Sequence, residues 1–199
     1  MKQIRITRDD TGKVTFETVS VDTTETVFFT NLDPQAAHWP DLSTNQLGPA
    51  PSPNSSQSVV PAPGHLPGQV PYGCKILGHG NEQGIINVFA QLAAVAQPTP
   101  WVATVGQPIA EQQVVAGGMA PYAVTGQLFQ VIVGHNVIQS GSGIGPGLQL
   151  NPKTSDLGIT VTGTPTVVGT YTFTFTVSDA MGRNLQQAQY SMAVEAGAA

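Results

Sequence analysis

The clearest pattern in the chain is a strict alternation of apolar and polar side chains near its C-terminal end. Between Thr170 and Ser178, apolar side chains occupy every second position and threonines fill most of the others. The stretch Gln189–Val194 repeats the pattern, and Asp179–Gly182 between the two predicts a turn. A period of two is typical of antiparallel strands with one buried face. The C-terminal half is therefore predicted to be a β-sandwich.

The N-terminal half shows shorter β-rich segments. Residues 14–18, 25–30 and 84–89 predict strands, and the Pro- and Ser-rich stretch 41–63 predicts a long loop. The end of the segment 90–100, AQLAAVAQPTP, reads as a linker. We therefore expect an all-β chain with two domains, residues 1–96 and 97–199, and no helix of substantial length.

Composition narrows the possible functions. Charged residues make up only 10% of the 199 residues, against roughly 25% in average soluble chains. The net charge is −5 without a basic cluster, which argues against nucleic-acid binding. No run of 18 apolar residues occurs, so no membrane span is expected. The first residues, MKQIRITRDD, are too polar for a signal peptide, so either the protein is cytosolic or an export signal has been removed.

The single cysteine carries the candidate chemistry. Cys74 is followed by His79, which has glycines on both sides, and His38 lies just beyond an early predicted strand. A lone cysteine is most often a buried packing residue. However, strands predicted on both sides of the Cys-x4-His loop would hold it rigidly, and His38 would lie at the same end of the sheet if those strands are neighbours. Two imidazoles and one thiolate suit copper in electron transfer, although zinc accepts the same ligands.

These residues resemble the cupredoxin, or blue copper, family. The resemblance is carried by His38 and by PGQVPYGCKILGHGNEQGIINV from Pro67 to Val88, with an azurin-like Cys-to-His spacing. It implies a Greek-key sandwich with a type 1 copper held by His38, Cys74 and His79. The family's axial methionine is missing, so the resemblance implies Gln83 as a stellacyanin-like axial ligand. Glu82 and a backbone carbonyl near His38 remain the alternatives.

One departure from the family concerns how the ligand loops are braced. Trp39 follows His38, where cupredoxins often have an asparagine that braces the two ligand loops. The origin of that bracing in this chain is therefore open at the level of sequence.

The second half resembles the Ig-like modules of bacterial surface and secreted proteins, the cadherin-like or PIG type. Three stretches carry the resemblance, namely IGPGLQL from Ile144, GITVTGTPT from Gly158 and GTYTFTFTVSD from Gly169. The resemblance implies a β-sandwich that acts as a spacer or binding module without catalysis. We therefore expect two tandem β-sandwiches, cupredoxin-like and then Ig-like.

Together these features predict one-electron transfer by a mononuclear copper site, with a redox partner protein, in the periplasm or outside the cell. No catalytic constellation is evident, and four protein ligands leave no open position for a substrate, so we expect a protein that is not an enzyme. One alternative is a surface or binding protein whose metal site is structural, holds zinc or is lost. Another is copper storage or delivery, which requires an exchangeable site.

Overall fold

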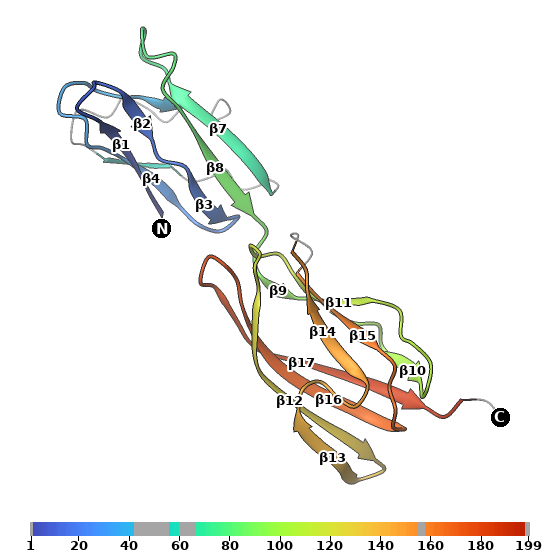
Figure 1. Ribbon diagram of the computed structural model, residues 1–199. Coiled ribbons are helices and arrows are strands. Elements are labelled where there is room, and N and C mark those ends of the chain that lie inside the picture. The colour runs from blue at the N-terminus through green and yellow to red at the C-terminus, as the bar shows by residue number, and fades with distance from the viewer. Residues whose placement is uncertain (1, 42–55, 60–66, 155–157, 198–199) are drawn as a thin grey trace. The chain divides into compact units, whose positions relative to one another are not determined.

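The chain forms two compact all-β units, residues 1–91 and 92–199 (Figure 1). The computed structural model describes residues 2–41, 56–59, 67–154 and 158–197. No helix occurs among these residues, which confirms the predicted all-β class. Consequently, no described helix is long and apolar enough to cross a membrane. Each unit consists of two sheets around its own core.

The first sheet of the N-terminal unit has the strand order β2-β1-β4-β6. Its strands are β1 (Lys2–Arg8), β2 (Val14–Phe16), β4 (Val27–Asn31) and β6 (Ser56–Val59). Strands β1 and β4 run parallel, and the other pairs are antiparallel. Strand β1 was not predicted, although Ile4 and Ile6 alternate there with polar residues and are both fully buried.

The second sheet of this unit has the order β3-β8-β7-β5. Its strands are β3 (Val19–Asp22), β5 (Pro40–Asp41), β7 (Gly68–Cys74) and β8 (Gln83–Phe89). Strands β7 and β8 are antiparallel neighbours, and β5 pairs with the end of β7. The closing strand predicted at residues 84–89 is therefore confirmed as β8.

Apolar side chains from both sheets form one core, which makes the N-terminal unit a sandwich. The core residues are Ile4, Ile6, Phe16, Val19, Val21, Val27, Phe29, Tyr72, Ile86 and Val88. Tyr72 of β7 stacks on Phe16 and meets Phe29 edge-on, and its hydroxyl donates to the Glu17 carbonyl. These contacts fix the strand that ends at Cys74.

Gly84 at the start of β8 is required by that tyrosine. A Cβ atom at position 84 would overlap the ring and hydroxyl of Tyr72. The ring cannot move away easily, because Phe16 and Phe29 enclose it and its hydroxyl is bonded. Glycine therefore lets β8 pair closely with β7 beside the candidate site.

The C-terminal unit also has two sheets. One has the order β14-β15-β11-β9, with β9 (Ala93–Ala94), β11 (Gln112–Ala116), β14 (Leu148–Pro152) and β15 (Ile159–Gly163). The other has the order β10-β17-β16-β12-β13, with β10 (Val102–Thr104), β12 (Ala123–Val133), β13 (Asn136–Ser142), β16 (Gly169–Ser178) and β17 (Asn184–Glu195).

The alternation in the sequence is borne out in this unit. The apolar residues of β16 are buried while its threonines lie on the other face, and β16 pairs with β17 in antiparallel register. The predicted turn is present, because the Gly182 amide donates to the Asp179 carbonyl. Strand β17 begins earlier than predicted, at Asn184, since its first residues continue the pairing with β16.

The boundary between the two units falls after residue 91, earlier in the sequence than the boundary predicted between residues 96 and 97. Strand β9 pairs with β11, and the Gln97 side chain donates to the carbonyls of Val95 and Gln113. Residues 92–96 therefore belong to the C-terminal unit, where β9 completes a sheet.

Candidate functional site

The candidate metal site is built around the turn that joins β7 to β8. Cys74 is the last residue of β7, and the turn closes when its amide donates to the Glu82 carbonyl at 3.0 Å. Two smaller turns lie within this loop. In one the His79 amide donates to the Ile76 carbonyl, and in the other the Glu82 amide donates to the His79 carbonyl. Gly78 has φ +93°, a conformation that favours glycine. The loop can therefore curl back so that Cys74, His79 and Glu82 face one another.

His38 reaches the same place from the segment after β4. The Trp39 carbonyl accepts a bond from the Lys75 amide at 2.9 Å, and Pro40 pairs with Cys74 across β5 and β7. The Trp39 amide also donates to Cys74 Sγ at 3.3 Å. The backbone of Trp39 thus braces the two ligand segments, a task that does not depend on its side chain.

Four side chains from these two segments converge. The ligand atoms of His38, Cys74, His79 and Glu82 all lie within 4.8 Å of one another. Glu82 Oε2 is 2.8 Å from His38 Nδ1 and 2.9 Å from His79 Nδ1, and Cys74 Sγ is 3.7 Å from His79 Nδ1. Both imidazoles therefore present Nδ1 to a shared centre that also holds a thiol and a carboxylate. This set can hold a metal ion.

Burial differs between the two histidines. The His38 side chain is fully buried, and Phe16 meets its ring edge-on with centroids 5.8 Å apart. The His79 side chain is 21% exposed, and Glu82 is 15% exposed. The site is consequently enclosed on the His38 side and closest to solvent at His79.

Electrostatics favour a protonated thiol when no cation is near. Burial raises the pKa of Cys74, and the Trp39 amide only partly offsets this effect by donating to the sulfur. A metal ion at the shared centre would lower the pKa of Cys74, because it binds the thiolate form.

A second carboxylate lies behind His38. Asp33 is fully buried, and its Oδ2 is 2.7 Å from His38 Nε2. The Arg8 guanidinium, followed by the bond to His38, holds the pKa of Asp33 well below its usual range despite burial. Asp33 is therefore an ionised acceptor on the side of the ring opposite to the cluster.

Three of the four residues predicted as ligands come together, and the fourth lies elsewhere. His38, Cys74 and His79 are in the cluster. The Gln83 side chain is exposed, and its amide lies 3.4 Å from the Gly80 carbonyl. Gln83 is the first residue of β8 and pairs with Gly73, so its side chain lies over that glycine. Glu82, the alternative in the sequence analysis, occupies the position beside the histidines.

Sequence reasoning missed the pair behind His38. Asp33 lies three residues beyond the strand predicted at 25–30, and Arg8 lies in a strand that was not predicted. The available signal was Asp33 five positions before His38. Nothing in the sequence connected Asp33 or His38 to Arg8, because β1 and β4 become neighbours only in the sheet.

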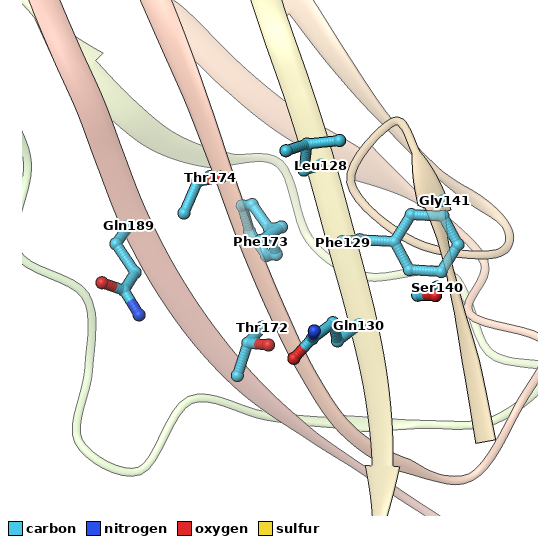
Figure 2. Close-up of a pocket in the computed structure, with 9 residues that line it drawn as sticks. All are labelled: Leu128, Phe129, Gln130, Ser140, Gly141, Thr172, Phe173, Thr174 and Gln189. Carbon is cyan, nitrogen blue, oxygen red and sulfur yellow. The ribbon is translucent and has the colours of Figure 1, made fainter. Parts of the chain in front are cut away.

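The C-terminal unit has a depression of a different character on the sheet formed by β13, β12, β16 and β17 (Figure 2). Its lining residues are Leu128, Phe129, Gln130, Ser140, Gly141, Thr172, Phe173, Thr174 and Gln189. None of these is an acid, a base or a cysteine, so the lining offers hydrogen bonds and apolar contact only. The cluster in the N-terminal unit is therefore the better candidate for chemistry.

The chain belongs to an Ig-like family. Residues 92–195, just over half of the chain, match the He_PIG family model, described as "Putative Ig domain". This match confirms the Ig-like module that the sequence predicted. None of the reported matches is a cupredoxin, so the cupredoxin identity of the N-terminal unit stays a prediction. No curated protein matches the chain.

Three solved structures show a distant similarity to this chain. A structure of three titin Ig domains, carrying glutamate-to-alanine mutations, is 10% identical with a TM-score of 0.43 and covers all of this chain. A Bacteroides ovatus protein of a mixed-linkage glucan utilization locus, SGBP-B, solved with a mixed-linkage heptasaccharide, is 14% identical over 88% of the chain, with a TM-score of 0.26. An endo-fucoidan hydrolase of glycoside hydrolase family 107 is 16% identical over 87%, with a TM-score of 0.31.

This chain spans 65%, 42% and 24% of those three chains, respectively. It is therefore shorter than each of these three chains.

Proposed function

We propose that the N-terminal unit binds one copper ion through His38, Cys74, His79 and Glu82 and transfers single electrons. The observation that carries this proposal is the convergence of both Nδ1 atoms, the sulfur and one carboxylate oxygen within 4.8 Å. Thiolate stabilises Cu(I), imidazole accepts both oxidation states, and ligands held by two sheets limit rearrangement during electron transfer.

The carboxylate gives this site its particular character. Glu82 replaces the weak axial ligand that the cupredoxin resemblance led us to assign to Gln83. A carboxylate is a hard, anionic ligand, so it favours Cu(II) over Cu(I) more strongly than a thioether or an amide does. We therefore propose a low reduction potential and a visible spectrum different from that of a methionine-ligated site.

The exposure of His79 supports a path for electrons. Its side chain is the most exposed of the imidazoles in the cluster, and the neighbouring Leu77 is fully exposed. We propose that a redox partner protein docks at this loop and exchanges one electron with the copper through His79. With four protein ligands, no position is left for a substrate, so we propose that the protein is not an enzyme.

The composition and the Ig-like module support an extracellular or periplasmic location. Few charges and a Thr-rich sheet are typical of exported β-proteins, and the module would position the copper unit near its partner.

Structural zinc is the second candidate. The combination of one thiolate, one carboxylate and two imidazoles balances the charge of Zn²⁺ and suits four-coordinate binding. The proximity of all four ligand atoms supports this reading as well, and it predicts a colourless, redox-silent protein.

Titration of metal-free protein with Cu(II) tests the proposal. One equivalent should produce an intense visible thiolate-to-copper band, which Cys74→Ser abolishes and His79→Ala strongly alters. His135→Ala is the matched control, because His135 is an exposed histidine of the C-terminal unit. Reversible voltammetry of the loaded protein should show a one-electron couple. Absence of the band, with stoichiometric Zn²⁺ binding, would favour the zinc function instead.

A further inference from the structure

The Arg8 and Asp33 side chains form a fixed support behind the buried histidine of the cluster. Asp33 Oδ2 lies 2.7 Å from His38 Nε2, while His38 Nδ1 faces Glu82 on the other side of the ring. Asp33 is thus placed to act on the cluster through His38, without belonging to it.

Asp33 itself is held from three directions. The Arg8 guanidinium donates from Nε to both carboxylate oxygens at 3.0 Å and from Nη2 to Oδ2 at 2.7 Å. The Gln35 amide donates to Oδ1 at 2.8 Å, and Asn31 Oδ1 accepts from the Asp33 amide. Arg8 is anchored in turn, since its Nη1 donates to the Gly12 carbonyl. The carboxylate position is therefore set by strand β1 and by the turn after β4.

The contact with Asp33 places a hydrogen on Nε2 of His38. A carboxylate paired with a guanidinium accepts hydrogen bonds and donates none, so the contact with Asp33 requires a hydrogen on Nε2. A neutral His38 ring then carries its lone pair on Nδ1, the atom that faces the cluster. The same bond increases the electron donation of the imidazole to a metal.

We propose that Asp33 is a positioning residue, locked by Arg8, which holds the His38 ring with Nδ1 directed at the metal and strengthens it as a ligand. This inference rests on the proposed metal function. It adds that the buried imidazole is a stronger donor than the exposed one and that the oxidised metal is favoured accordingly.

The test compares wild-type protein with Asp33→Asn, which preserves the shape and removes the charge. Asp10→Asn is the matched control, because Asp10 is exposed in the turn between β1 and β2. Arg8→Lys is a second variant, which keeps the positive charge but loses the paired donors Nε and Nη2 that bind the Asp33 carboxylate. Copper titration should show one equivalent bound in all variants, with affinity reduced about 10- to 100-fold in Asp33→Asn and the reduction potential shifted upward.

A metal-free readout separates this inference from the copper function. In NMR spectra of the ¹⁵N-labelled metal-free protein, His38 should show a slowly exchanging, downfield Nε2 proton. That signal should disappear in Asp33→Asn and persist in Asp10→Asn. If the wild-type protein lacks the signal, or if Asp33→Asn retains wild-type affinity and potential, the positioning role is overturned. If the signal behaves as expected and no thiolate-to-copper band forms, only the copper function fails.

Discussion

Oε2 of Glu82 lies 2.8 Å from Nδ1 of His38, although 44 positions separate the two residues in the sequence. The contact joins the hairpin loop between β7 and β8 to the segment that follows β4. It also brings a carboxylate to the position where the family resemblance had suggested an amide. Glu82 is therefore the residue that we propose as the fourth ligand.

Exchanging the two neighbouring side chains tests the fourth ligand directly. Glu82→Gln removes an anionic ligand while keeping its volume, so Cu(II) should be less favoured and the reduction potential should rise. Each tenfold change in the relative affinity for the two oxidation states corresponds to about 59 mV for one electron. Voltammetry and the visible spectrum measure the change.

The neighbouring position provides the matched control. Gln83→Glu places a carboxylate on the exposed side of β8, so the spectrum and the potential should stay at wild-type values. A spectrum that responds to Gln83→Glu and ignores Glu82→Gln would return the axial position to Gln83.

Metal should stabilise one unit only. All four proposed ligands lie in residues 1–91, and each unit has its own core. At a free metal concentration 100 times the dissociation constant, the stabilisation should be about 2.7 kcal/mol. Trp39 and Trp101 are the only tryptophans and lie in different units, so single-tryptophan variants can follow each unfolding transition.

The matched controls for this experiment are two core variants. Phe29→Ala should lower the transition of the N-terminal unit and Phe173→Ala that of the C-terminal unit, each by about 3–5 kcal/mol. A metal-dependent shift in the Trp101 transition would contradict the assignment of the site to the N-terminal unit.

Gly84→Ala should destabilise the N-terminal unit by about 1–3 kcal/mol, because the added Cβ overlaps the enclosed Tyr72 ring. Gly80→Ala is the matched substitution, since no neighbouring atom lies within 4 Å of a Cβ at that position. Urea unfolding monitored at Trp39 compares the two. Equal free energies of unfolding for Gly84→Ala and Gly80→Ala would show that the Tyr72 ring can shift to accommodate the added Cβ atom.

Asp179 should prove essential to the turn between β16 and β17. Its buried carboxylate accepts from the amides of Met119, Met181 and Arg183, and from the Arg183 side chain. Asp179→Ala removes these hydrogen bonds, at a cost of about 3 kcal/mol. Unfolding of the C-terminal unit, followed at Trp101, measures the loss. Asp10→Ala, at an exposed turn, should leave the free energy unchanged.

The sequence alone determined the fold class and, in the C-terminal unit, the hairpin of β16 and β17. Strict alternation in β16 and a turn rich in Asp and Gly are local signals, because the side chains of a strand alternate between two faces whatever the partner strand is. Strand β1 was not predicted, because Ile4 and Ile6 are its only apolar residues and the stretch around them is polar. The boundary expected between residues 96 and 97 differs from the division after residue 91, because the pairing of β9 with β11 is not a local property.

For the candidate site, the sequence predicted the residue types and the hairpin that carries Cys74 and His79. The tertiary structure decided the rest. The choice between Glu82 and Gln83 depends on which side of the sheet each side chain faces at the strand start, and adjacent residues there face opposite ways. The support from Arg8 and Asp33 depends on the parallel pairing of β1 with β4, a contact between distant segments that only the packed sheet creates.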